Sequence, residues 1–294
     1  MTESLSFRLL AILFPIFGIV AAGYFYARHH KPEMAVANRL NMDVFVPALV
    51  FAAMAGKSFD LTRFASLAFG GLLVLTTCGA LAWVSARALG IQAKTLVPPM
   101  MFNNSGNIGL PLAVLAWGED ALAAAVILFM VENTLHFSFG ARLLDPQTRL
   151  LKLWRVPVVF AAIAGLSVAI LDLSVWPPLI LAIKMLGDVS VPLLLFSLGV
   201  RMTHVSFSEW KLAAGSALLR PLAGMVIAAG VIQLLGLQGR EAAMLLVFGA
   251  LPPAVLNFLF AERYQQEPQR VASIVLIGNL AALLYLPLAL AMVL

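Results

Sequence analysis

Long runs of apolar residues, separated by short polar segments, make up most of the chain. A bilayer core needs roughly 20 apolar residues per helix, so each run has the length of a membrane-spanning helix. Transmembrane β-strands would instead alternate apolar and polar residues, which disfavours a barrel. The runs predict ten helices, near 8–27, 36–56, 64–86, 95–117, 120–140, 155–174, 178–200, 210–235, 241–262 and 270–293.

Composition identifies lipid as the solvent of this chain. Of its 294 residues 62% are hydrophobic and 11% are charged, and the mean hydropathy is +0.98. Soluble domains carry about 25% charged residues, so a soluble protein with one membrane anchor is excluded. The net charge of +5 is dispersed through short loops, and we predict no nucleic-acid partner. The predicted fold class is an all-α membrane protein with a single integral membrane domain, residues 1–294.

The basic residues favour one side of the membrane. With ten helices, Arg8, Lys57, Arg63 and Arg240 fall on one side, whereas Lys184 and Arg220 fall within helices. The other thirteen of the 19 Lys and Arg (19 minus four minus two) share the opposite side. Basic loops stay in the cytoplasm. We therefore expect a multi-pass protein of the inner (plasma) membrane with both termini on the outer, periplasmic side.

The two halves of the chain contain similar segments centred on proline. These are VPALVF and VPLLLF at 46–51 and 191–196, and LPLAVL and LPPAVL at 110–115 and 251–256. Five helices per half reverse the side of entry, so we expect two inverted repeats, 1–145 and 146–294. Inverted repeats with paired broken helices are typical of secondary transporters.

Predicted helices four and nine contain residues that interrupt an α-helix. Segment 103–111 holds three asparagines, two glycines and a proline, and segment 249–257 holds a glycine, two prolines and an asparagine. Proline removes a backbone donor and glycine relaxes the backbone. Unwound backbone is tolerated in a membrane only inside protein or beside a watery cavity. We expect Pro111 and Pro252 each to begin a half-helix near the bilayer middle.

Two half-helix N-termini that converge from opposite sides make a site for an anion. Each has unpaired N–H groups and about half a positive charge, which suits a carboxylate. Nearby amide side chains can orient such a ligand. The predicted substrate-binding residues are Asn103, Asn104, Gly106, Asn107, Gly109, Pro111, Pro252, Pro253, Asn257 and Arg220. The alternative is that the prolines only kink helices and the asparagines bond neighbouring helices.

Ionisable residues at depth cost about 2.5–3.5 kcal/mol on insertion scales, so they are usually functional or paired. Arg220 either balances substrate charge or pairs with Glu132 or Asp43. The two acidic residues are also the candidates for coupling to protons or sodium. Lys184 and Asp188 have the i, i+4 spacing of an ion pair. Glu132 and His136 share this spacing and form either a proton relay or a buried hydrogen bond.

Taken together, these segments resemble the auxin efflux carrier family of membrane transporters, including its bacterial members. The resemblance covers essentially the whole chain and rests, in order, on Leu40–Asn41 with Val46–Phe51, Asn104–Pro111, Leu251–Ala254 and Ala261–Tyr264. It implies a fold shared with bile-acid/sodium symporters, with crossing broken helices, substrate bound at the crossing, elevator-like movement and a homodimer. It also implies a carboxylate substrate, because plant members move auxin and bacterial members move malonate or related dicarboxylates.

The sequence therefore predicts a secondary transporter that carries small organic anions, such as mono- or dicarboxylates, by elevator-type alternating access. Its partners are the anion, the bilayer and a coupling proton or sodium ion. We predict no catalytic residue, metal or cofactor, because HExxH, GxSxG and carboxylates at metal-ligand spacing are missing from the sequence. The alternatives are a sodium-coupled organic-anion symporter, a channel and a non-transporting membrane sensor.

Overall fold

The computed structural model describes residues 4–55, 61–148, 156–204 and 209–294, and every regular element in these ranges is helical. The all-α prediction is thus confirmed for them. Seven segments are long and apolar enough to cross a membrane: Leu5–His30, Ala35–Met54, Phe64–Leu89, Glu119–Leu144, Pro177–Arg201, Trp210–Leu235 and Pro268–Ala291. Two shorter apolar helices are Ser105–Trp117 and Pro157–Ile170. The orientation stays a prediction, and four of the cations on which it rests, Lys57, Arg149, Lys152 and Arg155, lie outside the described residues.

The first half of the chain contains three π-helical turns, η1, η2 and η4, that interrupt otherwise α-helical segments. Its elements are α1 (Leu5–His30), α2 (Ala35–Leu40), η1 (Asn41–Phe45), α3 (Val46–Met54), α4 (Leu61–Leu89), α5 (Ala93–Met101), η2 (Ser105–Gly109), α6 (Leu110–Trp117), η3 (Glu119–Ala121), α7 (Leu122–Leu135), η4 (His136–Gly140) and α8 (Ala141–Leu144). The second half contains α9 (Pro157–Ile170), α10 (Pro177–Asp188), α11 (Ser190–Arg201), η6 (Met202–His204), α12 (Trp210–Leu235), α13 (Gly239–Ala250), α14 (Leu256–Arg263) and α15 (Pro268–Ala291).

Local sequence explains several helix ends. Ser4 caps α1, because its Oγ accepts a hydrogen bond from the Phe7 N–H at 3.3 Å. Helices α9, α10 and α15 each begin with proline. A residue in the first turn of a helix has no carbonyl to which its N–H can donate, so the missing N–H of proline costs nothing there. Helix α12 ends at Gly236, whose φ of 63° is left-handed and suits glycine.

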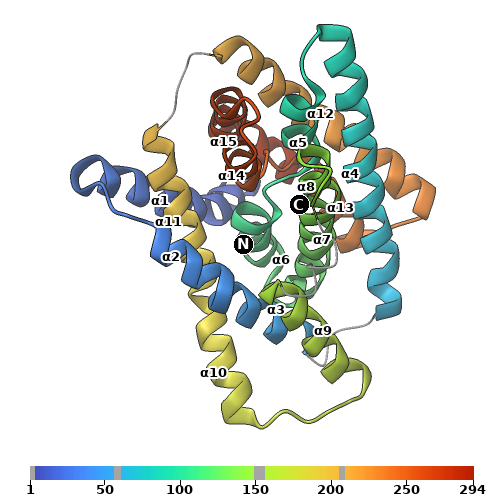
Figure 1. The fold of residues 1–294 in the computed structure, drawn as a ribbon. Coiled ribbons are helices and arrows are strands. Elements are labelled where there is room, and N and C mark those ends of the chain that lie inside the picture. The colour runs from blue at the N-terminus through green and yellow to red at the C-terminus, as the bar shows by residue number, and fades with distance from the viewer. Residues whose placement is uncertain (1–3, 56–60, 149–155, 205–208) are drawn as a thin grey trace.

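The helices form two packed groups, which Figure 1 shows side by side. Group A contains α1, α2–α3, α9 and α10–α11, and group B contains α4–α8 and α12–α15. Close backbone approaches hold each group together. In group A, Gly23 of α1 and Gly199 of α11 are positions where an added Cβ would collide with backbone of the opposite helix. In group B, Gly224 of α12 and Gly249 of α13 have the same relation.

The two predicted breaks exist, but the half-helices begin at other residues than expected. The first begins at Ser105, because the chain is unwound at 102–104, and Pro111 lies in the first turn of α6. Between Ser105 and α6 the chain forms the π-turn η2, in which the Leu110 N–H donates a hydrogen bond to Ser105 O. The second half-helix begins at Leu256, and Pro252 lies inside the unwound segment. The chain makes no helical hydrogen bonds there, so the N–H that proline lacks is not needed.

Candidate functional site

The two unwound segments cross each other and pair as a short antiparallel contact. Asn104 N–H donates to Pro252 O at 2.7 Å, and Ala254 N–H donates to Phe102 O at 2.9 Å. Asn103 thereby lies opposite Pro253 in an isolated β-bridge. These bonds satisfy peptide groups that would each cost several kcal/mol if left unpaired in lipid. The crossing therefore joins the two halves of group B through backbone rather than side chains alone.

Amide side chains satisfy more of the peptide groups around the crossing. Asn103 Nδ2 donates to Phe248 O at 2.7 Å, and Asn257 Nδ2 donates to Phe102 O at 3.1 Å and to Ala254 O at 2.9 Å. The Oδ1 atoms of Asn103 and Asn257 are buried and have no partner among the described residues. These two asparagines, both predicted to bind substrate, thus donate their amide N–H groups to backbone carbonyls of the protein.

Asn279 of α15 completes this network, and the sequence analysis did not single it out. Its Nδ2 donates to Pro253 O at 2.9 Å and to Val275 O at 2.8 Å, and its Oδ1 accepts from Asn104 Nδ2 at 2.8 Å. The available signal was one amide within an apolar span, a residue type that often bonds helices across a membrane. Asn279 thus anchors both unwound segments to α15.

A cavity of about 170 Å³ lies between group A and the crossing. Its walls come from α2–η1, α7, α11 and both crossing segments. Five of the residues singled out from sequence line it: Asn103, Asn104, Gly106, Asn107 and Glu132. The sequence analysis missed other polar lining residues, namely Asn38, Asn133, Ser197 and Arg201. The structure thus brings a cluster of amide groups together with one acid and one base.

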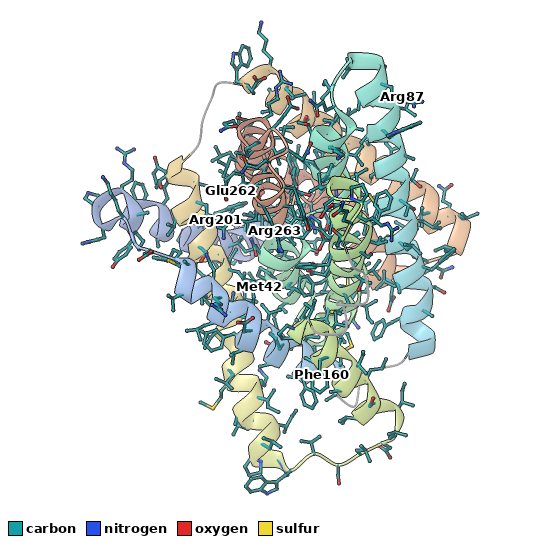
Figure 2. The ribbon with its side chains drawn as sticks, in the orientation of Figure 1. Met42, Arg87, Phe160, Arg201, Glu262 and Arg263 are labelled. Atoms are coloured by element: carbon teal, nitrogen blue, oxygen red, sulfur yellow. The ribbon has the colours of Figure 1, made fainter. Side chains whose placement is uncertain are left out.

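Arg201 is the basic side chain of this cavity. It lies at the end of α11, is only partly exposed, and makes no hydrogen bond or ion pair within 4 Å in the described part of the chain. Glu262 of α14 is near enough to act on it electrostatically, and Figure 2 shows both side chains in the middle of the view, with Met42 of the same cavity below them. The sequence analysis counted Arg201 among loop cations, because it falls at the end of a span.

The starts of both half-helices face the cavity. Gly106 and Asn107 belong to the first turn of Ser105–Trp117, and Val255 and Leu256 to the start of α14. The first N–H groups of a helix have no intrahelical acceptor and carry partial positive charge. Asn107 is partly exposed, and its amide makes no hydrogen bond in the described residues. Together with Arg201, this wall presents free donors to a ligand.

Arg220 lies outside this cavity and is buried in group B, with 1% exposure. Its Nη1 donates to Gly249 O at 2.8 Å, at the C-terminal end of α13, where a helix carries partial negative charge. Its Nε and Nη2 have no hydrogen-bond partner among the described residues. Arg220 therefore neutralises the end of a half-helix, and it pairs with neither acid that sequence suggested for it.

The remaining predicted residues lie apart from the cavity. Asp43 pairs with Arg39 at 3.6 Å on an exposed face. Lys184 lies 3.6 Å from Asp188 and borders a second cavity of about 310 Å³. Four more residues, Pro111, Gly109, Pro252 and Pro253, shape the half-helices and the crossing without lining the 170 Å³ cavity.

Comparison with known proteins supports a membrane transport protein. Residues 146–290 match the family model described as "Membrane transport protein". The resemblance to the auxin efflux carrier family is confirmed, because the chain also matches members named for auxin efflux. It is 28% identical to auxin efflux carrier component 6 of Arabidopsis thaliana over 45% of this chain and 24% of that protein.

Two microbial relatives align over nearly the whole chain. A Rhizobium meliloti protein named "Putative malonate transporter" is 26% identical over 93% of this chain and 92% of its own length. An "Uncharacterized transporter" of Methanothermobacter thermautotrophicus is 25% identical over 88% of both chains. Each of these alignments covers most of both sequences.

Proposed function

We propose that this protein is a secondary carrier of small carboxylates and that they bind in the 170 Å³ cavity at the crossing. The observation that carries the proposal is that Arg201 lines one cavity together with two half-helix starts and makes no hydrogen bond in the described residues. Arginine binds carboxylates through two parallel N–H donors. Asn107 and the free N–H groups of Gly106 and Leu256 supply further donors to the same ligand.

A dicarboxylate such as malonate suits this wall, since its two charges can divide between the guanidinium and the half-helix starts. The relative named as a malonate transporter supports the same class of substrate. Apart from its amides, Ser197, Glu132 and Arg201, the lining is apolar. A small ligand is also what a cavity of about 170 Å³ holds.

The proposed transport mechanism is alternating access by an elevator movement of group B against group A. Ten membrane passes follow when the two broken segments and α9 are added to the seven long spans (seven plus three). The crossing pairs residues 150 apart (253 minus 103), and α3 and α11, which carry the VPALVF and VPLLLF segments, both belong to group A. Both relations support two inverted repeats with the cavity on the sliding surface between the groups.

The test is malonate counterflow and net uptake in proteoliposomes of the purified protein, with Arg201→Gln as the main variant. A charge-assisted hydrogen bond contributes about 2 kcal/mol, so we expect apparent affinity to fall about 30-fold. Asn107→Ala removes a neutral donor, which contributes about 1 kcal/mol, and a fall of roughly fivefold follows.

The matched control is Arg263→Gln, which removes an exposed arginine near the same end of the molecule but outside the cavity. It should transport within twofold of the wild type. Equal losses in the Arg201 and Arg263 variants would contradict the site, since they would report surface charge only. Absence of counterflow by folded wild type with every small mono- and dicarboxylate would contradict the carrier function.

A further inference from the structure

One acidic side chain, Glu132 of α7, lies in the wall of the proposed substrate cavity and is paired with a buried histidine. Glu132 Oε1 is 3.0 Å from His136 Nδ1, and the two residues are 3% and 0% exposed. In the described lining Glu132 is the only acid and Arg201 the only base. The pair therefore holds the one titratable acid that a bound anion would meet directly.

The surroundings of His136 offer its ring no other polar partner in the described residues. Phe102 stacks on the ring with centroids 4.1 Å apart, and Phe260 meets it edge-on at 5.0 Å. His136 Nε2 is buried without a hydrogen-bond partner there. When the pair binds one proton beyond a Glu132 carboxylate and a neutral His136 imidazole, it is neutral overall. Without that proton the pair carries one net negative charge in an apolar site, at a large desolvation cost.

Glu132 also reaches the half-helix start that a substrate would use. Its Oε2 lies 3.4 Å from Ser105 Oγ, the first residue of Ser105–Trp117, whose N-terminal end carries partial positive charge. A bare Glu132 carboxylate therefore competes with a substrate carboxylate for the same end. Adding a proton to the pair removes the competing negative charge and leaves the half-helix start to the substrate.

The elements packed around α7 and η4 carry few ionisable groups. The segments α3, η2, α6 and α9 contain none. The groups on the remaining neighbours are Cys78 and Arg87 of α4, Glu119 and Asp120 of η3, Arg142 of α8, Arg240 and Glu241 of α13, and Glu262 and Arg263 of α14. Arg201 is the one that shares the cavity with Glu132.

We propose that the Glu132–His136 pair is a proton-binding site that couples transport to the proton gradient, so that each carboxylate substrate enters with one proton. This inference rests on the proposed carrier function. The proton arrives from water in the cavity through the Glu132 carboxylate and is held by the hydrogen-bonded Glu132–His136 pair as a whole. Because the two ligands favour each other's binding, the coupling is reciprocal.

The first measurement separates the coupling from the carrier function. Counterflow of malonate at equal pH requires binding and exchange but no net proton movement, whereas accumulation against a malonate gradient requires coupling. Wild-type proteoliposomes should accumulate malonate when the compartment that supplies it is the more acidic one. Malonate affinity should fall as the pH rises, by at most about tenfold per pH unit, which is the slope for one linked proton.

The second measurement uses Glu132→Gln, which fixes a neutral side chain of the same shape. This variant should lose accumulation driven by the pH gradient and bind malonate with an affinity that no longer depends on pH. Calorimetry in buffers of different ionisation heat should find one proton taken up per malonate by the wild type and none by the variant. Glu33→Gln, an exposed change of the same chemistry, is the matched control and should behave as wild type.

The outcomes divide cleanly. Wild type that neither exchanges nor accumulates malonate refutes the proposed function. Wild type that exchanges malonate, but accumulates it only with a sodium gradient, refutes the proton site and leaves the carrier intact. Proton-driven accumulation that persists in Glu132→Gln also overturns the proposal, because the proton must then travel elsewhere, for example on the substrate. Thermal unfolding in detergent and size-exclusion chromatography check that Glu132→Gln folds.

Discussion

The substitution Gly224→Ala is the sharpest test of how closely α12 and α13 pack in group B. Gly224 of α12 faces α13 so closely that an alanine Cβ would overlap Gly249 O and lie 2.8 Å from Gly249 C. The same Cβ would lie 2.6 Å from Arg220 Nη1, the atom that donates to Gly249 O. Both obstacles on α13 are backbone atoms, so α13 must move away from α12.

The expected cost combines two effects. Overpacking of a filled interior costs about 1–3 kcal/mol. Displacement of the Arg220 guanidinium weakens a hydrogen bond to a charged group, which contributes about 1.5–3 kcal/mol. Together these effects lower the free energy of unfolding by about 3 kcal/mol. For a chain of this size the melting temperature then falls by roughly 6 °C. Because α13 leads directly into the crossing, uptake should fall as well.

The assay is thermal unfolding in detergent, followed by tryptophan fluorescence, together with malonate counterflow. Gly215→Ala is the matched control, because Gly215 lies in the same helix and an added Cβ there meets no atom within 4 Å. We expect that control to melt within about 1 °C of the wild type. If the Gly224 and Gly215 variants melt alike, the close approach of α12 and α13 is wrong, and with it the placement of Arg220.

Two further predictions concern residues on either side of the site. Asn279→Ala removes three hydrogen bonds, two of them at the crossing, and leaves Pro253 O and Asn104 Nδ2 buried without that partner. We therefore expect a loss of about 3 kcal/mol in thermal unfolding, and Asn279→Asp should retain part of this stability. Asp43→Asn breaks only an exposed i, i+4 pair with Arg39, so stability should change by less than about 0.5 kcal/mol and the pH dependence of uptake should match wild type. A pH dependence lost in the Asp43 variant would move the coupling site away from the cavity.

The apolar pattern was sufficient to predict the membrane helices, because hydropathy reports burial in lipid directly. Each of the seven long spans coincides with a predicted range to within a few residues. The pattern also predicted which two segments break, since Asn103, Gly106 and Pro252 combine amides and helix breakers inside apolar runs. These features are local, and local chemistry decides them.

The residues at which the half-helices start were not predictable in the same way. LPLAVL and LPPAVL look equivalent in sequence, 141 residues apart, yet the first lies in α6 and the second begins in the unwound segment. The crossing instead pairs Asn103 with Pro253, which are 150 apart (253 minus 103). Hydrogen bonds from Asn103, Asn257 and Asn279 to distant carbonyls fix that register, and no local pattern contains them.

The contrast between Arg220 and Arg201 explains why the sequence pointed to the wrong arginine as a ligand-binding residue. Arg220 lies at mid-span, where a charge is costly, and it meets that cost by donating to the carbonyl end of α13. Arg201 lies at the end of a span, where Glu262 acts on it electrostatically, and makes no hydrogen bond in the described residues. A donor that is already used stabilises the protein, whereas a donor left free beside a cavity can bind a substrate. Depth in the membrane thus predicts which charges must be paired, and only the pairing itself reveals which charges are available for a ligand.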